Sequence, residues 1–171
     1  MRDRETERLL LRRWRRDDLE PYVRICADPE VMRFIADGAT RTPEEAAAEL
    51  SYIESHWKHH GWGLWAAELR ATGELIGFVG LSEPTFIPEL IGSVEVGWRL
   101  GREHWNQGLA TEGARIALEV GFGELELEEI VSIIDPGNVA SVRVAEKLGM
   151  RYDGPVTHPR GFPVGVYRLR G

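Results

Sequence analysis

The sequence predicts a single mixed α/β domain over residues 1–171, in which helices flank a mostly antiparallel sheet. Apolar residues recur at helical spacing in some segments and in strict alternation in others, which indicates both helices and half-buried strands. Between two helical segments, Ile130–Ile134 is an apolar run interrupted only by Ser132, typical of a strand buried on both faces. With 171 residues, 43% of them hydrophobic, the chain can fold around one core.

Charge and cysteine content exclude several classes of protein. The chain has 21 Lys and Arg and 28 Asp and Glu, a net charge of −7, which argues against a protein that coats nucleic acid or an anionic membrane. Its single cysteine, Cys26, cannot form an internal disulfide, and no signal-peptide pattern opens the sequence. No apolar run approaches the roughly 18 residues of a membrane-spanning helix. We therefore expect a cytoplasmic protein with no nucleic-acid or membrane partner.

The first third of the chain predicts one strand and three helices. Leu9–Leu11 are typical of a short strand, and Asp17–Glu20 of a capping box that opens a helix. Asp28-Pro29-Glu30 begins a second helix, which runs past Ile35 and ends at Asp37-Gly38. Thr42-Pro43-Glu44-Glu45 begins a third, with Thr42 as its cap.

The middle of the chain predicts antiparallel strands followed by a helix. Alternation over Leu64–Leu69 and Leu75–Leu81 predicts a hairpin. Ser93–Leu100 alternates again, and Gly97 within it marks a bulge or a close approach of the backbone. Ala110–Phe122 has a face of small residues suited to close packing on a sheet.

The last third predicts a strand, a helix and two further strands. After Ile130–Ile134, the turn Asp135–Asn138 leads into a helix that Gly149 ends in a Schellman motif. Strands follow near Arg151-Tyr152 and over Val164–Leu169. The last of these is a candidate edge for pairing with a second copy of the chain.

Two junctions between a strand and a helix are the candidate functional segments. Trp98–Glu112 places a glycine-bearing loop at the start of a helix, where free N–H groups and the helix dipole can hold a phosphate. It matches neither a P-loop nor a dinucleotide fingerprint, and a simple glycine turn is the alternative. About thirty residues on, Asp135–Met150 supplies the second junction.

With both junctions in this order, the chain resembles the GNAT superfamily of acyl-CoA-dependent N-acetyltransferases, and within it the RimJ/RimL-like branch. The resemblance extends over nearly the whole chain. It includes the opening segments Thr6–Arg12 and Asp28–Met32, the hairpin segment Gly73–Gly77 and the strand segment Val94–Trp98. It implies a GNAT fold with a splayed, mostly antiparallel sheet of six to seven strands.

The resemblance also implies that acetyl-CoA binds where the fourth and fifth strands separate. The backbone of Val96, Gly97 and Trp98 would pair with the pantetheine arm. The pyrophosphate would lie in the loop formed by Asn106, Gln107, Gly108, Leu109, Ala110 and Thr111. Trp105 stands where the wider family usually has Gln or Arg, so main-chain contacts are expected there in place of a side-chain cation.

Asn138 and Ser141 match positions that approach the thioester in this family. The departing thiolate needs a proton, which the Ser141 hydroxyl could supply. The alternative interpretations are structural: Ser141 as a residue of the first helical turn and Asn138 as a helix cap.

The acceptor amine must lose a proton before it attacks, and Glu95 is the first candidate base. It lies beside the expected thioester site among apolar residues, where desolvation would raise its pKa. An exposed or salt-bridged strand carboxylate is the alternative, and Glu68 and Glu83 are weaker candidates. A main-chain N–H near Val96–Gly97 could stabilise the oxyanion.

Other chemistry-bearing residues have structural interpretations. His56 and His60 have metal-binding spacing but lack the Glu of a His-Glu-x-x-His motif, so they indicate a solvated helix end, and no metal is expected. Cys26 occupies an apolar helix position and is expected to be buried and inert. A cluster of four arginines near the N-terminus is expected to form a solvated face: Arg12, Arg13, Arg15 and Arg16.

These observations predict an enzyme that transfers acetyl from acetyl-CoA to a primary amine by direct attack. The acceptor is a protein N-terminal α-amino group, as in RimJ/RimL-like enzymes, or a small-molecule amine, and the resemblance assigns its selection to residues 31–42 and 83–91. The alternative is a non-catalytic domain that binds or senses acyl-CoA. Similar proteins commonly form dimers, so a homodimer is the expected assembly.

Overall fold

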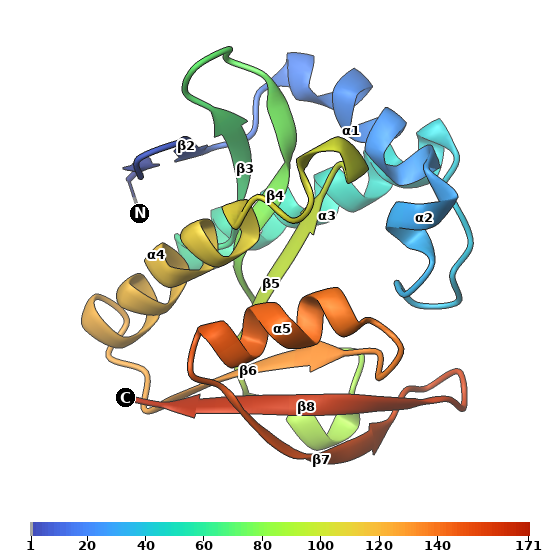
Figure 1. Ribbon diagram of the computed structural model, residues 1–171, viewed down its shortest axis with the longest axis vertical. Coiled ribbons are helices and arrows are strands. Elements are labelled where there is room, and N and C mark those ends of the chain that lie inside the picture. The colour runs from blue at the N-terminus through green and yellow to red at the C-terminus, as the bar shows by residue number, and fades with distance from the viewer. Residues whose placement is uncertain (1) are drawn as a thin grey trace.

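A computed structural model describes residues 2–171, which form a single eight-stranded sheet in the order β1-β2-β3-β4-β5-β6-β8-β7 (Figure 1). The strands are β1 (Arg4–Glu5), β2 (Leu9–Arg12), β3 (Leu64–Leu69), β4 (Leu75–Ser82), β5 (Glu95–Leu100), β6 (Glu129–Ile134), β7 (Arg151–Thr157) and β8 (Pro163–Arg170). The helices are α1 (Leu19–Ala27), α2 (Pro29–Met32), α3 (Pro43–His60), α4 (Leu109–Gly123) and α5 (Val139–Lys147). Short 3-10 turns, η1 (Arg16–Asp18), η2 (Pro88–Leu90) and η3 (Arg102–His104), link them.

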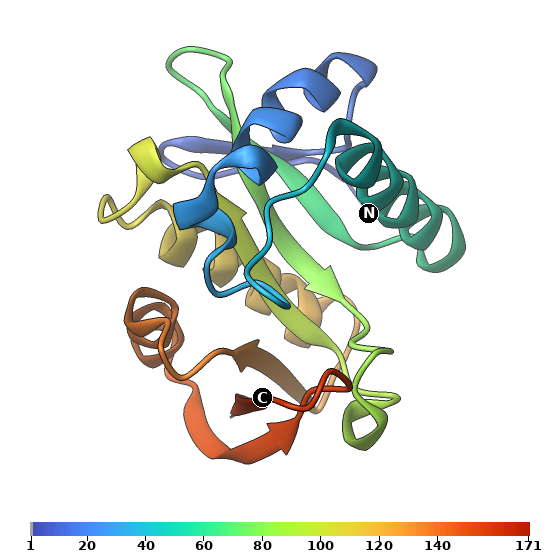
Figure 2. The same ribbon diagram turned by 90° about the vertical axis from the view of Figure 1, so that its right-hand side faces the viewer.

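The sheet opens between β5 and β6. These strands run parallel and pair at one position, Glu95 opposite Val131, whereas every other pair of neighbouring strands is antiparallel. β5 stays paired with β4 as far as Leu100, and β6 is paired with β8 over its whole length. Figure 2 shows the result: the orange and red C-terminal elements form a group set apart from the rest of the sheet. The expected splayed, mostly antiparallel GNAT fold is confirmed, with eight strands in place of six to seven.

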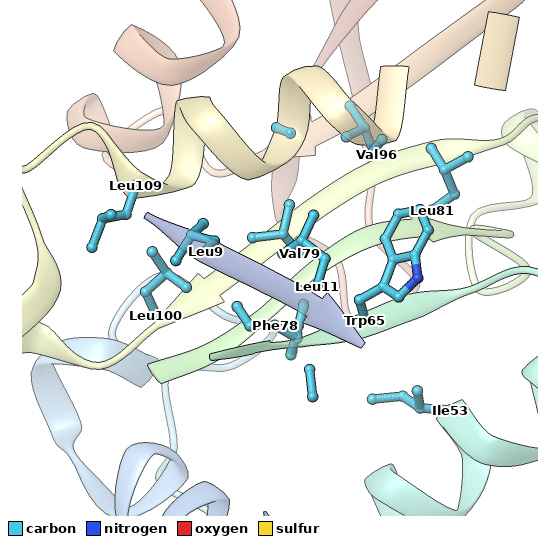
Figure 3. Close-up of a cluster of buried hydrophobic side chains, with 14 of the residues drawn as sticks. Leu9, Leu11, Ile53, Trp65, Phe78, Val79, Leu81, Val96, Leu100 and Leu109 are labelled. Atoms are coloured by element: carbon cyan, nitrogen blue, oxygen red, sulfur yellow. The ribbon is translucent and has the colours of Figure 1, made fainter. Parts of the chain in front are cut away.

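Helices cover both faces of the central strands. Figure 3 shows α4 on one face of the sheet, near Leu109, and Ile53 of α3 on the other. The close approach of α4 depends on its glycines: a Cβ on Gly113 would lie 3.2 Å from the Val79 side chain, and one on Gly121 would lie 2.4 Å from Ile130 Cδ1. The small-residue face is therefore needed for packing, because larger side chains would force the helix away from the strands.

Local capping signals set several helix ends as expected. Thr42 forms the capping box, in which its hydroxyl accepts the Glu45 N–H at 3.2 Å while the Glu45 carboxylate accepts the Thr42 N–H at 2.8 Å. Gly149 adopts φ +82° and completes the Schellman motif, with Met150 N–H bonded to Ala145 C=O at 3.0 Å.

The capping box expected at Asp17–Glu20 is wrong. The helix begins at Leu19, and the Asp18 carboxylate instead accepts two bonds of 2.7 Å from the Arg12 guanidinium. Arg12 is only 3% exposed and also donates to Glu68 at 2.6 Å. Its assignment to a solvated arginine face is therefore also wrong, because this buried cation needs these two carboxylates.

Three other expectations are corrected. The second helix ends at Met32, so Phe34 and Ile35 leave it, although the Asp28 cap on Glu30 N–H is present at 2.8 Å. The β4–β5 register is continuous through Gly97, which therefore forms no bulge. β8 lies between β6 and β7, so β7 is the outer strand and β8 offers no free edge.

The burial expected for Cys26 is confirmed. Cys26 is free and fully buried in α1, and burial raises the pKa of its thiol. Both properties suppress the reactive thiolate. Within residues 2–171, every helix is too short or too polar to cross a bilayer.

Candidate active site

Two adjoining depressions occupy the region where the sheet opens. The first, which we call the outer cleft, has a volume of about 440 Å³ and lies between β5, the loop before α4, and α5. The second, the inner cavity, has a volume of about 390 Å³ and lies between α3, the ends of β4 and β5, and β6. The two meet at a shared set of lining residues: Phe34, Ile35, Trp98, Arg99, Asn138 and Ser141.

The backbone of β5 presents polar groups to the outer cleft. Val94 C=O points to β6, where it accepts the Val131 N–H at 2.9 Å. Because backbone groups alternate along a strand, those of Trp98 point the same way, into the region where β6 has diverged. Leu100 follows the same alternation, and its C=O accepts the Trp105 indole N–H at 2.8 Å.

This alternation divides the three residues expected to pair with a pantetheine arm. Trp98 has its N–H and C=O free to do so. Gly97 lies opposite Gly80 and turns its polar groups to β4, so it supplies neither that pairing nor the expected oxyanion donor. Its missing side chain instead leaves open space in the inner cavity, since a Cβ there would meet nothing within 4 Å. Val96 is fully buried in the core.

The loop before α4 has the conformation of an anion site. Asn106 and Gly108 adopt left-handed φ values of +58° and +80°, and Gly108 caps the helix without any side-chain acceptor. The first-turn N–H groups of α4 are thus left without a side-chain partner at the positive end of the helix dipole. Five of the six expected pyrophosphate-loop residues line the outer cleft: Asn106, Gly108, Leu109, Ala110 and Thr111.

Gln107, the sixth, does not line the cleft. Its side-chain amide nitrogen donates to the backbone carbonyl of Glu103 at 2.9 Å. Its backbone carbonyl accepts a hydrogen bond of 2.8 Å from the Arg8 guanidinium. Arg8 also pairs with Glu112 of α4 at 2.6 Å. Arg8 therefore holds the loop and the start of α4 on the side away from the outer cleft. The loop N–H groups that face the cleft remain available to a ligand.

Two cations that the sequence reasoning missed also line the outer cleft. Arg143 and Lys147 lie four residues apart on α5, on one face of the helix, and both are exposed. Neither forms an ion pair with any described residue. Their spacing within Asp135–Met150 was the available signal. They give the cleft a positive rim suited to phosphate groups.

Ser141 and Asn138 lie at the meeting point of the two depressions. The Ser141 hydroxyl oxygen accepts a bond of 3.2 Å from the Trp98 indole N–H. Asn138 Oδ1 accepts the Ser141 N–H at 3.1 Å, so its interpretation as the cap of α5 is confirmed. The Ser141 hydroxyl oxygen acts as an acceptor toward Trp98, so its own O–H remains able to donate into the site.

Glu95 lies in the inner cavity, at the position where β5 and β6 separate. One carboxylate oxygen accepts the Ile133 N–H at 3.2 Å, and burial raises the pKa of Glu95 to about 7. The expected desolvation shift is confirmed. Of the weaker candidates, Glu83 lines the same cavity, whereas Glu68 is held by Arg12 outside it.

A buried ion pair forms another wall of the inner cavity. The Arg99 guanidinium, 9% exposed, donates to Glu49 at 2.9 Å and to the Tyr22 hydroxyl oxygen at 2.9 Å, and stacks on Phe78 at 5.1 Å. Burial acts to raise the pKa of Glu49, but the charge and hydrogen bonds of Arg99 outweigh it and lower that pKa. Glu49 is therefore a fixed negative charge facing the cavity.

The family model described as an acetyltransferase (GNAT) domain matches residues 8–151. The chain belongs to the GNAT acetyltransferase family. It is 33% identical over 169 residues to the YkkB protein of Bacillus subtilis, covering 96% of this chain and 94% of that one. It is 30% identical over 159 residues to a spermidine N(1)-acetyltransferase of Escherichia coli, covering 92% and 80%. The GNAT chain is thus an acyl-CoA-dependent acetyltransferase by family.

Solved structures agree with this assignment. An acetyltransferase from Agrobacterium tumefaciens has a TM-score of 0.85 at 28% identity, covering 100% of this chain and 95% of its own. A RimL ribosomal L7/L12 α-N-protein acetyltransferase, solved with coenzyme A, has a TM-score of 0.76 at 12% identity, covering 96% and 95%. The RimJ/RimL-like resemblance thus extends to the fold.

Proposed function

We propose that this protein transfers the acetyl group of acetyl-CoA to a cationic primary amine by direct attack, with Glu95 as base and Ser141 as acid. The observation that carries the proposal is the meeting of the two depressions at Trp98 and Ser141. A phosphate-suited cleft lies on one side of that point, and a cavity holding a carboxylate of raised pKa lies on the other.

The residues of the outer cleft fit acetyl-CoA. Trp98 offers backbone groups for an added strand of amides. The uncapped start of α4 after Gly108 suits a pyrophosphate, and Arg143 and Lys147 suit the remaining phosphate charge. When bound, acetyl-CoA supplies a thioester carbonyl that an amine can attack.

Glu95 holds the proton taken from the acceptor. A primary amine is mostly protonated near neutral pH and attacks only after losing that proton. Because the pKa of Glu95 is about 7, its carboxylate is about half ionised at neutral pH and is more basic than an ordinary glutamate. Glu95, Trp98 and Ser141 all line the inner cavity, so an acceptor amine bound there would face all three residues.

Ser141 returns a proton to the sulfur that departs as a thiolate. The Trp98 N–H orients the hydroxyl oxygen, and the O–H is left to donate toward the outer cleft. No covalent enzyme intermediate is needed, because Cys26 is buried in α1 with a raised thiol pKa and lines neither depression.

The charge of the inner cavity supports a cationic acceptor. Carboxylates from four segments line it, Glu49, Glu83, Glu95 and Asp135, against two arginines, Arg41 and Arg99. Arg99 and Glu49 pair with each other, which leaves three carboxylates facing one arginine. The relative that acts on spermidine supports a small amine of this kind. Phe34 and Phe86 come from the two segments assigned to acceptor selection and give apolar contact for a carbon chain.

A thiol-release assay tests the proposal. Acetyl-CoA is supplied with spermidine, other aliphatic diamines, or peptides bearing a free N-terminus, and the free thiol is measured. We expect turnover with a cationic amine and loss of turnover, with retained acetyl-CoA binding, in Ser141→Ala. Turnover with N-terminal peptides alone would transfer the assignment to protein acetylation. Acetyl-CoA binding without turnover on any amine would support the sensing domain.

The proposal includes one domain over residues 1–171 acting in the cytoplasm, where a lone cysteine is kept reduced. It also includes a homodimer. The edge strands of the sheet are β1 and β7, so pairing of two sheets through the C-terminal strands would use β7 and not β8. Light scattering of the purified protein measures the assembly.

A further inference from the structure

The end of α3 gathers two histidines that the proposed acetyl transfer does not use and a glutamate, Glu83, that enters it only as one of the carboxylates lining the inner cavity. His56 and His60 lie one helical turn apart, and their rings stack with centroids 4.3 Å apart. Glu83 follows β4 directly, and its carboxylate lies 3.7 Å from His60 Nε2. One candidate ligand atom from each of the three residues lies within 4.8 Å of the others.

The hydrogen bonding of His56 leaves a nitrogen lone pair free. Its Nδ1 lies 3.0 Å from the carbonyl oxygen of Trp62, which can only accept, so Nδ1 carries the proton. Nε2 is then an acceptor, yet it is buried and has no hydrogen-bond partner among the described residues. A carbonyl on one ring nitrogen and a free lone pair on the other is the arrangement of a metal-ligating histidine.

We infer that His56, His60 and Glu83 form a binding site for a divalent transition metal of the Zn²⁺ class. Two imidazoles and one carboxylate are a donor set that Zn²⁺ accepts, with a fourth position left for water. Metal–ligand bonds of about 2.0–2.2 Å place tetrahedral ligands about 3.4 Å apart. The separations between the ligand atoms, 4.8 Å or less, need to close by up to about 1.4 Å. Rotation of the Glu83 carboxylate and of the two stacked imidazoles, all three partly exposed, supplies that closure and turns the ring lone pairs toward one point.

A metal at this site would link the end of α3 to the segment that follows β4. Glu83 opens the segment that runs to η2, and it also lines the inner cavity. A metal shared with His56 and His60 would join the end of α3 to this segment. It would thereby stabilise the folded chain and fix one wall of the inner cavity without contacting the outer cleft.

The sequence indicated a solvated helix end here because no glutamate follows His56 in a His-Glu-x-x-His pattern. The third ligand instead comes from Glu83, on a different element. In addition, His56 and His60 are partly buried against Trp62, at ring distances of 4.8 and 5.3 Å. His59 lies between them in sequence, is exposed and offers no ligand atom to the cluster, while its ring packs edge-on against that of His60 with centroids 4.6 Å apart. His59→Ala is therefore a control for the loss of one ring beside the site.

Calorimetric titration of Zn²⁺ into tag-free protein, treated with a chelator and then dialysed, tests the site. We expect binding of one ion and a higher unfolding temperature with Zn²⁺. His60→Ala and Glu83→Gln should each weaken the affinity by at least about tenfold, whereas His59→Ala should leave it unchanged. Co²⁺ should give the intense visible absorption of a tetrahedral site in the wild type and in His59→Ala alone.

Three outcomes would overturn the inference: no saturable binding of Zn²⁺ to the wild type, equal weakening by His59→Ala, or binding that survives both His60→Ala and Glu83→Gln. Unfolding temperatures measured without metal identify a variant that fails to fold. Because Glu83→Gln removes no ring packing, it keeps the test decisive if His60→Ala is unstable.

Discussion

Replacing Glu95 with Gln tests the proposed base, because it keeps the size of the side chain and its ability to accept the Ile133 N–H. The substitution should lower kcat by about 10²- to 10⁴-fold, the usual contribution of a general base. A base must be deprotonated, and with a pKa of about 7 the active fraction rises from about a tenth at pH 6 to about nine tenths at pH 8. An ordinary glutamate would be ionised throughout that range.

The same substitution should affect stability with the opposite sign. The folded-state pKa of about 7 exceeds the ordinary value of 4.5, so the folded state binds the extra proton between these values. The stabilising contribution of protonated Glu95 to the free energy of unfolding of the wild type is then lost as pH rises through 7. Glu95→Gln has no such contribution to lose. The upward shift corresponds to about 3 kcal/mol in favour of the variant by pH 8, relative to pH 4.

The assay is thiol release from acetyl-CoA as a function of pH, paired with urea unfolding. The ratio of wild-type to Glu95→Gln rates cancels the titration of the amine itself, and it should rise through pH 7 to a plateau. Glu119→Gln, an exposed carboxylate on α4, serves as the control and should match the wild type. A ratio that stays flat across pH 6 to 8, or a Glu95→Gln variant of full activity, would refute the assignment of Glu95 as the base.

The remaining predictions concern the outer cleft, the acid and the N-terminal core. Arg143→Ala and Lys147→Ala should each raise the KM for acetyl-CoA about fivefold with kcat unchanged, because each removes one exposed charge pair of about 1 kcal/mol; unchanged KM in the double variant would contradict the phosphate role. Ser141→Ala should lower kcat by about a hundredfold while calorimetry finds the same affinity for CoA; full kcat would leave Ser141 a helix residue only. Asp18→Asn should cost about 3 kcal/mol in urea unfolding, because it leaves the buried Arg12 with one carboxylate; a loss below about 1 kcal/mol would show that Glu68 alone satisfies it.

Features set by near neighbours in the chain could be predicted from the sequence. The Thr42 capping box and the Gly149 Schellman end each involve residues within one helical turn, so the residue types themselves specify the contact. The hairpin of β3 and β4 follows from alternation and a local turn. The direction of the Glu95 pKa shift was also predicted, because a carboxylate on a strand of apolar residues is expected to be desolvated.

Features that depend on how the elements pack against one another could not be predicted. Aspartate is a residue type that often caps helices, but the fold brings the Arg12 guanidinium to Asp18. The carboxylate accepts hydrogen bonds from this buried cation in place of the N–H groups that begin α1. The order of β7 and β8 depends on which strand meets β6, and alternation does not specify that choice. The orientation of the Gly97 backbone likewise depends on the pairing of Val94 with Val131 of β6, a contact between strands far apart in sequence.

Thermal unfolding with acetyl-CoA, CoA, ATP and NAD in parallel tests the claim that acetyl-CoA binds in the outer cleft. A ligand at about 100 times its Kd stabilises the folded state by about 2.7 kcal/mol, an increase of about 5–10 °C in Tm for a chain of this size. The expected result is that rise with acetyl-CoA and CoA, and a smaller or absent one with ATP and NAD. Unchanged unfolding temperatures with acetyl-CoA and CoA at millimolar concentration would contradict the claim.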